Sequence, residues 1–576
     1  MTRWDRRPWA NWLGNVVVDR PERHYYPTTL HDLIGIVADA ERQTPPRTVR
    51  ASGSHWALSD VAAGPDWFVE TDALTDTLTS VVPHALAESA REEIARRPPG
   101  TGQGFTYYHV QAGITVRALN ERLDADPRQR WSLPTMGGAA GQTLAGAMST
   151  GTHGGDHGLP PMADFVQAIH LVTSGGRQLW IERDPGITDP KLLAEVLPAV
   201  EQHRSTSLFN AALVAVGRMG IIYSLVIRVV EQFSLDQIIV QSTWEQSQGQ
   251  LRAPFPIFTQ PPPKGSRPAA AERTHFVEVV MSPYAADDGR HVCYITLRWS
   301  GPDGPRLPPP RKTPFTLICR HRTLRPVVLA LLAGDAASLL LTKALAPGAK
   351  PVIRAQTVTL PVLALLLPVS GEVTVGGLVA AACNAANRAH QPWLVRRLTA
   401  QVLRQARPRR RIQDVGYHIM DLGRTGADCY RGDSLEVAFD ATAGEHVRFV
   451  CEDLFPAFER MAAQGVTVPC YISLRFTRKS AALLAMQRWD PTCSIEVAVL
   501  KGIRGSETIL DTLQTAAVRR GGTVHWGQHN TLDGTAVQRA FPQLPQWRAE
   551  AALVMGTQHE TFDSPFCRTR GLLPSR

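Results

Sequence analysis

The sequence lacks several features that would assign a chain to a class at once. None of its eight cysteines forms a CxxC pair, so the spacing of a metal site is missing, and we expect reduced cysteines in the core. No apolar run reaches the roughly 18 residues of a membrane span. The nearest candidates, 327–342 and 357–369, contain an aspartate or prolines. The charged N-terminus has no apolar stretch typical of a signal peptide, so we expect a cytoplasmic protein.

Acidic residues are scarce in one long segment. Residues 311–411 contain sixteen basic residues and only two acids, whereas the whole chain has a net charge of +9. The remainder is therefore net acidic, and the basic character belongs to an insert. This distribution argues against a nucleic-acid-binding protein. A length of 576 residues, with 44% hydrophobic and 20% charged residues, predicts a globular protein of two or three domains.

Glycine, by contrast, is concentrated between Pro134 and Pro161, in PTMGGAAGQTLAGAMSTGTHGGDHGLPP. Glycine is costly in helices and strands, so we expect neither a good helix nor an ordinary strand here. Successive backbone N–H groups in such turns can form a concave nest that binds an anion. A flexible surface loop is the alternative, but the apolar residues within 144–148 favour a buried, ordered loop.

The first 233 residues read as an α+β domain. A helix capped by Thr28 or Thr29 is followed by a short strand at 48–50, a small-residue turn and a strand at 68–70. This order places Ser52–His55 at a strand end, where open α/β folds bind ligands. Further elements are expected as strands at 107–113, 165–172, 178–181 and 221–230 and a helix at 116–123.

The pattern of residues 234–505 predicts a second α+β domain. We expect residues 506–576 to form a C-terminal segment that returns to the ligand site of the first domain. Proline clusters at 254–263 and 302–310 mark loops. The Ala/Leu/Arg-rich insert at about 315–411 is expected to be helical. Strands are expected at 276–281, 293–299, 417–422, 435–439, 468–476 and 493–500, and helices at 445–464 and 508–519.

Two glycine loops and a late motif carry a family resemblance. RASGSHWALSDVA (50–62) and LPTMGGAAGQTLAGAMSTGTHG (133–154) resemble the two flavin-binding loops of the vanillyl-alcohol oxidase/PCMH superfamily of FAD-linked oxidoreductases. HWGQ (525–528) resembles a motif of its L-gulonolactone oxidase and alditol oxidase branch. The resemblance implies a two-subdomain PCMH-type FAD-binding domain, a cap domain that binds the substrate, and D-arabinono-1,4-lactone oxidase-like chemistry.

The resemblance also implies which residues hold FAD. The first loop would cradle the pyrophosphate, the second would follow the ribityl chain and the flavin, and Ile222 would meet the adenine side. The implied cofactor-binding residues are Ser52, Gly53, Ser54, His55, Trp56, Gln142, Thr143, Gly146, Ser149, Thr150, Gly151, His153 and Ile222. We expect no metal ligands.

The first loop departs from the family at one position. Many relatives carry a histidine that is covalently linked to the flavin, but His55 lies one place early and Trp56 occupies the expected position. Two readings stay open from the sequence: a covalent link through His55, or FAD held noncovalently with His55 only forming hydrogen bonds.

The substrate site departs as well. Relatives carry a Glu-x-Arg on a cap strand, and here YISLRF keeps Arg475 but replaces the acid with Ser473. The last position of the late motif, which is lysine in these relatives, is Gln528 in this sequence. Arg475, His525, Gln528 and Glu436 are the candidate catalytic residues, with Arg475 as a positive charge near the flavin and His525 as a base or hydrogen-bond partner. Each could instead be an ordinary structural residue.

Two functions follow as hypotheses. The first is FAD-dependent oxidation of a CH–OH group in a sugar, aldonolactone or polyol, with electrons passed to O2 or another acceptor. The second is a catalytically diverged flavoprotein whose basic insert contacts a membrane surface or a partner chain. We favour the first, with the insert as an enlarged helical part of the cap.

Overall fold

Three larger β-sheets carry the chain, and a fourth, β2 (Trp9–Ala10) with β3 (Val17–Val18), is a short pair near the N-terminus. The α+β class is confirmed. The protein is described from a computed structural model. The described residues are 2–64, 66–265, 274–304, 306–307, 375–406, 411–422, 432–557 and 560–573.

The smallest of the three sheets lies nearest the N-terminus and holds the first glycine loop. Its order is β1 (Trp4–Asp5), β4 (Arg23–Tyr25), β6 (Trp67–Glu70) and β5 (Val49–Ser52), and β4, β6 and β5 are parallel. Helix α1 (Leu30–Glu41) begins at Thr29, whose side chain and Asp32 form a reciprocal capping box. The buried residues Leu33, Ile36 and Val37 of α1 pack in one core with Trp67, so the predicted helix and strands are confirmed.

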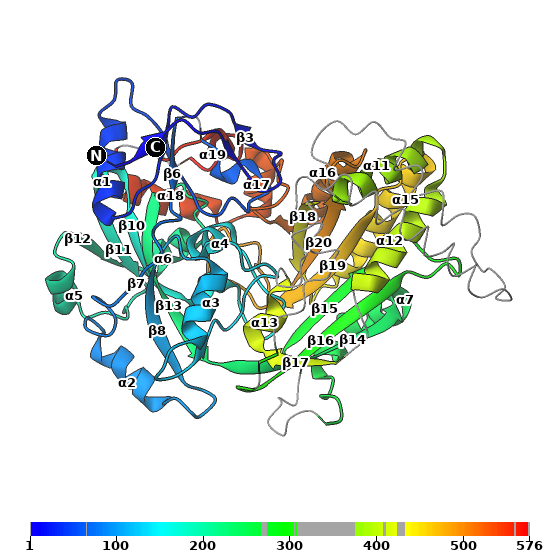
Figure 1. Ribbon diagram of the computed structural model, residues 1–576, viewed down its shortest axis with the longest axis horizontal. Helices are drawn as coiled ribbons and strands as arrows, with labels where there is room; N and C mark the ends of the chain where they lie inside the picture. The colour runs from blue at the N-terminus through cyan, green and yellow to red at the C-terminus, as the bar shows by residue number, and fades with distance from the viewer. Residues whose placement is uncertain are drawn as a thin grey trace, which may run out of the picture.

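A seven-stranded sheet follows. The predicted hairpin pairs β10 with β11 around the turn at Ser174–Gly176, and β13 joins β10 to β8. Helices α3 (Val116–Asp124) and α6 (Thr206–Leu213) lie beside this sheet (Figure 1). The sheet consists of β12 (Val200–Arg204), β11 (Gln178–Glu182), β10 (Val166–Val172), β13 (Ile221–Glu231), β8 (Phe105–Gln111), β7 (Thr77–Leu78) and β9 (Trp131–Ser132), which pairs with β13.

The third sheet, the cap sheet, forms the other half of the molecule (Figure 1). Most strands of this sheet are long and apolar, which explains why the sequence pattern predicts them as strands. In spatial order its eight strands are β17 (Ile412–Val415), β14 (Phe233–Thr243), β16 (Val292–Pro302), β15 (Phe276–Met281), β19 (Cys470–Thr477), β20 (Thr492–Leu500), β18 (Gly432–Asp440) and β21 (Thr523–Val524).

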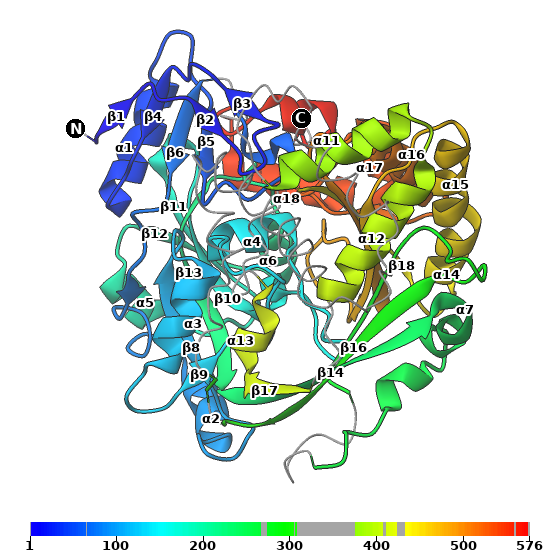
Figure 2. The ribbon, with the colours of Figure 1, turned by 45° about the vertical axis from the view of Figure 1, so that its right-hand side comes forward.

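Helices cover the cap sheet. The predicted helix at 445–464 is continuous but changes from α14 (Glu445–Arg448) through a π-helical turn to α15 (Phe455–Ala463). Helix α16 (Ser506–Arg519) matches its prediction. Figure 2 shows α12 (Pro392–Ala406) in front of the orange cap strands, with α11 (Val375–Arg388) above it. Both belong to the predicted helical insert, of which 308–374 and 407–410 lie outside the described residues.

One strand prediction is wrong. Residues 417–422 were expected to be a strand, but the strand is β17, just before them, and α13 (Gly416–Met420) follows. A single short apolar run fits a strand or a helical turn equally well, so periodicity could not distinguish them.

The C-terminal helices return to the N-terminal half. Figure 1 shows α17 (Gly534–Ala540), α18 (Leu544–Met555) and α19 (Pro565–Thr569) beside the blue N-terminal elements. The backbone N–H of Val49 donates to the carbonyl of Thr561 at 2.7 Å, so the chain's end adds a bond at β5. The boundaries at residues 233 and 505 stay predictions.

The described cysteines are all free, and Cys451 alone among them is exposed. Cys319 and Cys429 lie outside the described residues. No helix within the described ranges is long and apolar enough to cross a bilayer.

Candidate active site

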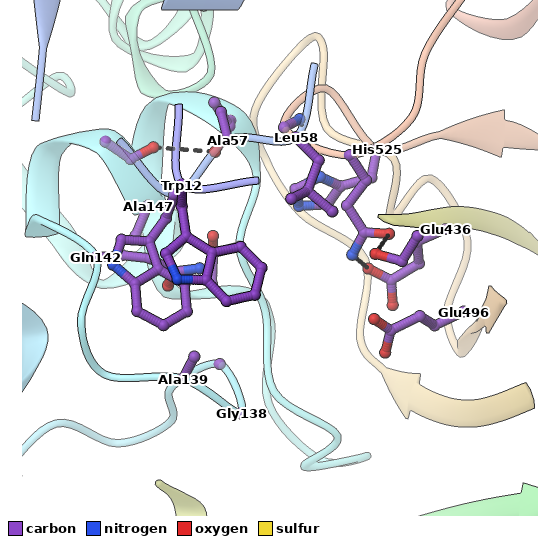
Figure 3. A pocket seen from close by; sticks show the side chains of 18 of the residues that line it. Trp12, Ala57, Leu58, Gly138, Ala139, Gln142, Ala147, Glu436, Glu496 and His525 are labelled. Atoms are coloured by element: carbon purple, nitrogen blue, oxygen red, sulfur yellow. Dashed lines mark hydrogen bonds between the residues drawn. The ribbon is translucent and has the colours of Figure 1, made fainter. Parts of the chain in front are cut away.

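A cavity of about 1060 Å³ lies between the two halves. One side, the loop wall, consists of the two glycine loops and Trp12. The other, the cap wall, consists of side chains from the cap sheet, helix α12 and the segment 525–528. In Figure 3, Trp12 and Gln142 lie across the cavity from Glu436 and Glu496. Of the implied FAD-binding residues, all but Gly151 line this cavity.

The first glycine loop leaves β5 and is held against the second. The hydroxyl of Ser54 accepts a hydrogen bond from the backbone N–H of Thr143 at 3.0 Å. A Cβ at Gly53 would collide with the hydroxyl of Thr143, so a larger residue would separate the loops. Among the described residues, the backbone N–H groups of Gly53–Trp56 donate to no acceptor, which leaves them for an anion.

The second loop contains a short helix, which corrects the prediction that this stretch would not be helical. Helix α4 (Leu144–Thr150) begins at Thr143, whose hydroxyl accepts from the N–H of Gly146 at 3.2 Å. It ends at Gly151, which has a left-handed φ of 85°. The sequence does contain the signals of a helix: the N-cap Thr143, the apolar residues within 144–148 and the C-cap Gly151. The high glycine content hid them.

Other second-loop residues offer polar groups to the cavity. Gln142 lines it, and its Oε1 atom is buried and has no hydrogen-bond partner. An unpartnered buried acceptor is costly, so this atom favours a bound group that donates to it. Thr150 and His153 lie where this loop meets the cap wall, because the ring of His153 is 6.4 Å from that of His525.

His55 is clamped at both ring nitrogens. Its Nδ1 lies 2.9 Å from the carbonyl of Ala10, and its Nε2 lies 2.8 Å from a carboxylate oxygen of Glu70. Both partners are acceptors, so the ring is held as a donor at each nitrogen. Burial lowers the pKa of His55, but the hydrogen bond that the ring donates to Glu70, together with the charge of that carboxylate, outweighs this effect, and the pKa is raised.

A stacked tryptophan pair forms part of the loop wall. The rings of Trp12 and Trp56 are 5.5 Å apart with an interplanar angle of 4°. The indole of Trp56 also fills the space beside Gly141, where a Cβ would lie 2.5 Å from it. The sequence alone does not indicate that Trp12 stacks on Trp56.

The cap wall is built around Arg475. Its Nη2 atom donates to Glu436 Oε1 at 2.8 Å and to Glu496 Oε2 at 3.0 Å. Glu436 Oε1 also lies 3.1 Å from Nε2 of His153, which belongs to the loop wall. Glu436 is 2% exposed, so these contacts hold a buried carboxylate between the two walls.

The acid that Ser473 replaces is supplied by the neighbouring strand. The hydroxyl of Ser473 donates to Glu278 Oε1 at 3.0 Å, and Glu278 is the cross-strand partner of Arg475. Glu496 is the cross-strand partner of both Ser473 and Glu436. Three carboxylates therefore surround one guanidinium, an excess of negative charge that the sequence did not reveal.

These carboxyl groups differ in protonation. Burial disfavours ionised Glu436, but His153 and Arg475 more than offset it, so its pKa lies well below the ordinary value. Burial raises the pKa of Glu496 to about 6. Arg475 acts to lower this pKa, but the negative charges of Glu436 and Glu278 partly cancel its effect. Glu496 thus changes charge near neutral pH, whereas Glu436 stays ionised.

His525 and Gln528, two of the candidate catalytic residues, lie beside these groups. The backbone N–H of Gly527 donates to His525 Nδ1 at 3.0 Å, and burial lowers the pKa of His525 to about 4. Gln528 donates to Glu436 Oε2 at 3.2 Å and accepts from the hydroxyl of Ser434 at 3.0 Å. A neutral histidine with an occupied Nδ1 is a poor base, so the site favours His525 as a hydrogen-bond partner.

Sequence reasoning missed Glu278 and Glu496. Each sits at the centre of an apolar strand, in FVEVVM and SIEVAV, as Glu436 does in SLEVAF. A glutamate in the middle of a buried strand is unusual. Its occurrence in three apolar strands could have indicated a cluster of buried carboxylates. Among the described residues, no group of His, Cys, Asp and Glu side chains could hold a metal ion.

Comparisons with known proteins agree with this geometry. Residues 104–182 match the sequence profile of the FAD binding domain family FAD_binding_4. D-arabinono-1,4-lactone oxidase of Eremothecium gossypii is 29% identical over 227 residues, which cover 39% of this chain and 34% of that protein. These matches agree with the resemblance of the two glycine loops to PCMH-type FAD-linked oxidoreductases.

Two further proteins are less similar in sequence. L-gulono-1,4-lactone dehydrogenase of Mycobacterium tuberculosis is 25% identical over 227 residues, 39% of this chain and 42% of that protein. The match thus spans about a third to two fifths of these relatives. The crystal structure of cholesterol oxidase from B. sterolicum is similar in fold, with a TM-score of 0.63 and 11% identity over 100% of this chain and 98% of that one.

Proposed function

We propose that this protein is an FAD-dependent oxidoreductase that oxidises a CH–OH group of a sugar-, lactone- or polyol-like substrate and passes the electrons to O2 or another acceptor. The observation that carries the proposal is the cap wall: Arg475, Glu436 and Glu496 line one cavity with the second-loop residue His153, and Glu436 contacts His153 directly. The names of the lactone oxidase and dehydrogenase relatives support the same class of reaction.

The loop wall fits FAD. Unpartnered N–H groups at Gly53–Trp56 suit a pyrophosphate, and the buried Oε1 of Gln142 suits a donor on the cofactor. Ile222, on β13, lines the same cavity on the side proposed for adenine. When bound, FAD supplies the hydride acceptor.

The chain's own residues would prepare the substrate. Glu496, with a pKa of about 6, is the group best suited to accept the hydroxyl proton at neutral pH. Arg475 would orient the substrate oxygen while holding Glu436 ionised. Neutral His525 would contribute a hydrogen bond rather than act as the base.

We further propose that FAD is held noncovalently. Both ring nitrogens of His55 already face acceptors, so neither presents a lone pair to the flavin. Denaturing the purified protein in acid should release the yellow colour into the supernatant. Colour that stays with the polypeptide would contradict this and assign a covalent bond.

The reaction is tested by anaerobic reduction of the bound flavin. Mixing the yellow protein with aldonolactones, polyols and simple sugars should bleach the flavin absorbance with at least one of them. Readmitting O2 then distinguishes an oxidase, which recovers its colour rapidly, from a dehydrogenase. A panel in which no alcohol bleaches the flavin would refute the proposed substrate class.

The described part of the basic insert supports an enlarged cap. On α11 and α12, Ala380, Cys383, Val395 and Leu403 are buried against the protein rather than presented as an apolar surface. The second hypothesis, a diverged scaffold acting through this insert, stays a prediction; Trp393 and Val402 on α12 are exposed apolar residues. We keep the proposed division into 1–233, 234–505 and 506–576.

A further inference from the structure

The cavity extends beyond the reacting groups along an apolar face. We infer that the substrate is an amphiphilic alcohol, with a neutral hydroxyl-bearing head at Arg475 and Glu496 and an apolar tail beneath helix α12. This rests on the proposed function, which supplies the position of the head. Three observations carry it: the residues along the cap strands, the lining of α12, and the charge of the cavity.

The cap strands change from charged to apolar within the cavity. On β15, Glu278 is followed on the same face by Val280, and on β19, Arg475 and Ser473 are followed in the opposite chain direction by Tyr471. Val280, Tyr471, Ala498 and Leu500 all line the cavity. Because residues two apart are about 7 Å from each other along a strand, the change from charged to apolar occurs over one or two such steps.

Helix α12 covers this apolar part. Leu398 and Val402 are four residues apart on one side of the helix, Leu403 follows Val402, and all three line the cavity. Leu403 packs with Val280 and Tyr294, which fixes α12 on the sheet. Figure 2 shows α12 lying over the cap strands.

The apolar lining is open to water. Val402 is 46% exposed and Tyr471 is 37% exposed, and both line the cavity. Exposed apolar residues gathered in one cavity mark a binding surface more often than scattered ones do. A substrate tail would cover this surface and remain continuous with a head held at the reacting groups.

The charges of the cavity select against an acidic head. Glu278, Glu436, Glu496 and Asp433 line it, and Arg475 is shared between two of these carboxylates. The guanidinium of Arg50 donates to backbone carbonyls, including that of Val216 at 2.8 Å. Carboxylates accept hydrogen bonds from hydroxyl groups but repel an anion, which favours a neutral head.

Alkyl β-D-glucosides test the tail directly. Dissociation constants for the FAD-loaded protein would be measured by calorimetry from the methyl to the decyl compound, below micelle formation. Each methylene that becomes buried should lower Kd by up to about fourfold. A Kd that is unchanged from methyl to decyl would overturn the inference.

Binding is measured whether or not the glucoside is oxidised, so the two proposals fail separately. A chain-length dependence without flavin reduction by any alcohol supports the tail site and refutes the reaction. Flavin reduction by short polyols without a chain-length dependence refutes the tail site alone.

Variants locate the tail. Val402→Asn should raise the Kd of decyl glucoside by about tenfold or more and flatten the chain-length series. Val240→Asn is the matched control, because Val240 is 44% exposed on β14 and does not line the cavity. Equal effects of the two variants would overturn the inference. Decyl glucuronide should bind at least tenfold more weakly than decyl glucoside, and equal binding would overturn the neutral head.

Discussion

The loop wall presents backbone to the cavity, whereas the cap wall presents charged side chains. Gly53, the N–H groups that follow it and helix α4 shape the loop wall, and a single added methyl group would disturb it. On the cap wall, Arg475, Glu436 and Glu496 depend on one another's charge. A backbone site is set by sterics and tolerates few substitutions, while a charge network can be retuned residue by residue. The wall proposed to bind a constant cofactor and the wall proposed to meet the substrate differ in this way.

The largest effect is expected on the cap wall, from Glu496→Gln. If Glu496 accepts the substrate proton, kcat should fall by about 10²- to 10⁴-fold. In the wild type, kcat should rise as pH increases through about 6, because the ionised carboxylate is the active form. This rise should disappear in the variant.

Glu459→Gln is its control, because Glu459 lies on α15 and pairs with Arg396 at 2.8 Å. It should leave kcat and the pH profile unchanged. If Glu496→Gln retains the wild-type rate, another group is the base and the two walls differ less than proposed.

The loop wall is tested by Gly53→Ala. The new Cβ meets the side chain of Thr143, and such overpacking costs about 1–3 kcal/mol, which would weaken FAD binding by about tenfold or more. FAD affinity is measured by titrating the apoprotein and following flavin fluorescence.

Gly35→Ala is the matched control, since nothing lies within 4 Å of its Cβ position in α1. That change should leave FAD affinity unchanged and stabilise the fold by about 0.5–1 kcal/mol. Unaltered affinity in Gly53→Ala would show that the two loops separate easily.

Gln528→Lys tests how far charge controls the cap wall. A lysine would add a positive charge beside Glu436, which shares Arg475 with Glu496, so the pH at which kcat rises should fall. The variant would lose the acceptor for Ser434. The pH dependence of kcat measures the shift, and an unchanged kinetic pKa would separate that ionisation from Glu496.

The smallest effect concerns the clamp on His55. Its raised pKa means that pairing with Glu70 adds stability that is complete below about pH 6.5 and is lost as pH rises through the raised value. The effect should stay below about 1 kcal/mol, because a third of the His55 side chain is exposed.

Glu70→Gln should therefore lose less unfolding free energy than the wild type as pH rises above about 6.5. Chemical denaturation at several pH values measures the difference. Parallel pH profiles for the two proteins would show that the pair carries no pH-dependent stability.

The two walls also differ in how well the sequence predicts them. The loop wall is contiguous in sequence, so its residues could be assigned from two short stretches, and all but Gly151 line the cavity. The helix within it was missed because glycine content outweighed the cap at Thr143. Glu278, Arg475 and Glu496 come from three strands, and their meeting depends on strand order and register. The spacing of residues along the chain reveals neither the strand order nor the register.

The C-terminal return has a consequence for how the protein is made. Arg50, beside the first loop, donates to the carbonyl of Phe562, and the N–H of Leu58 donates to Gly527. N-terminal units usually fold first as a chain leaves the ribosome. Here the first loop obtains its last supports from residues synthesised some 500 positions later. A chain that stops short of Gly527 therefore lacks both of these supports, although the contacts to Ala10 and Thr143 can already form, and we expect full ordering of the loop to follow synthesis of the C-terminal segment.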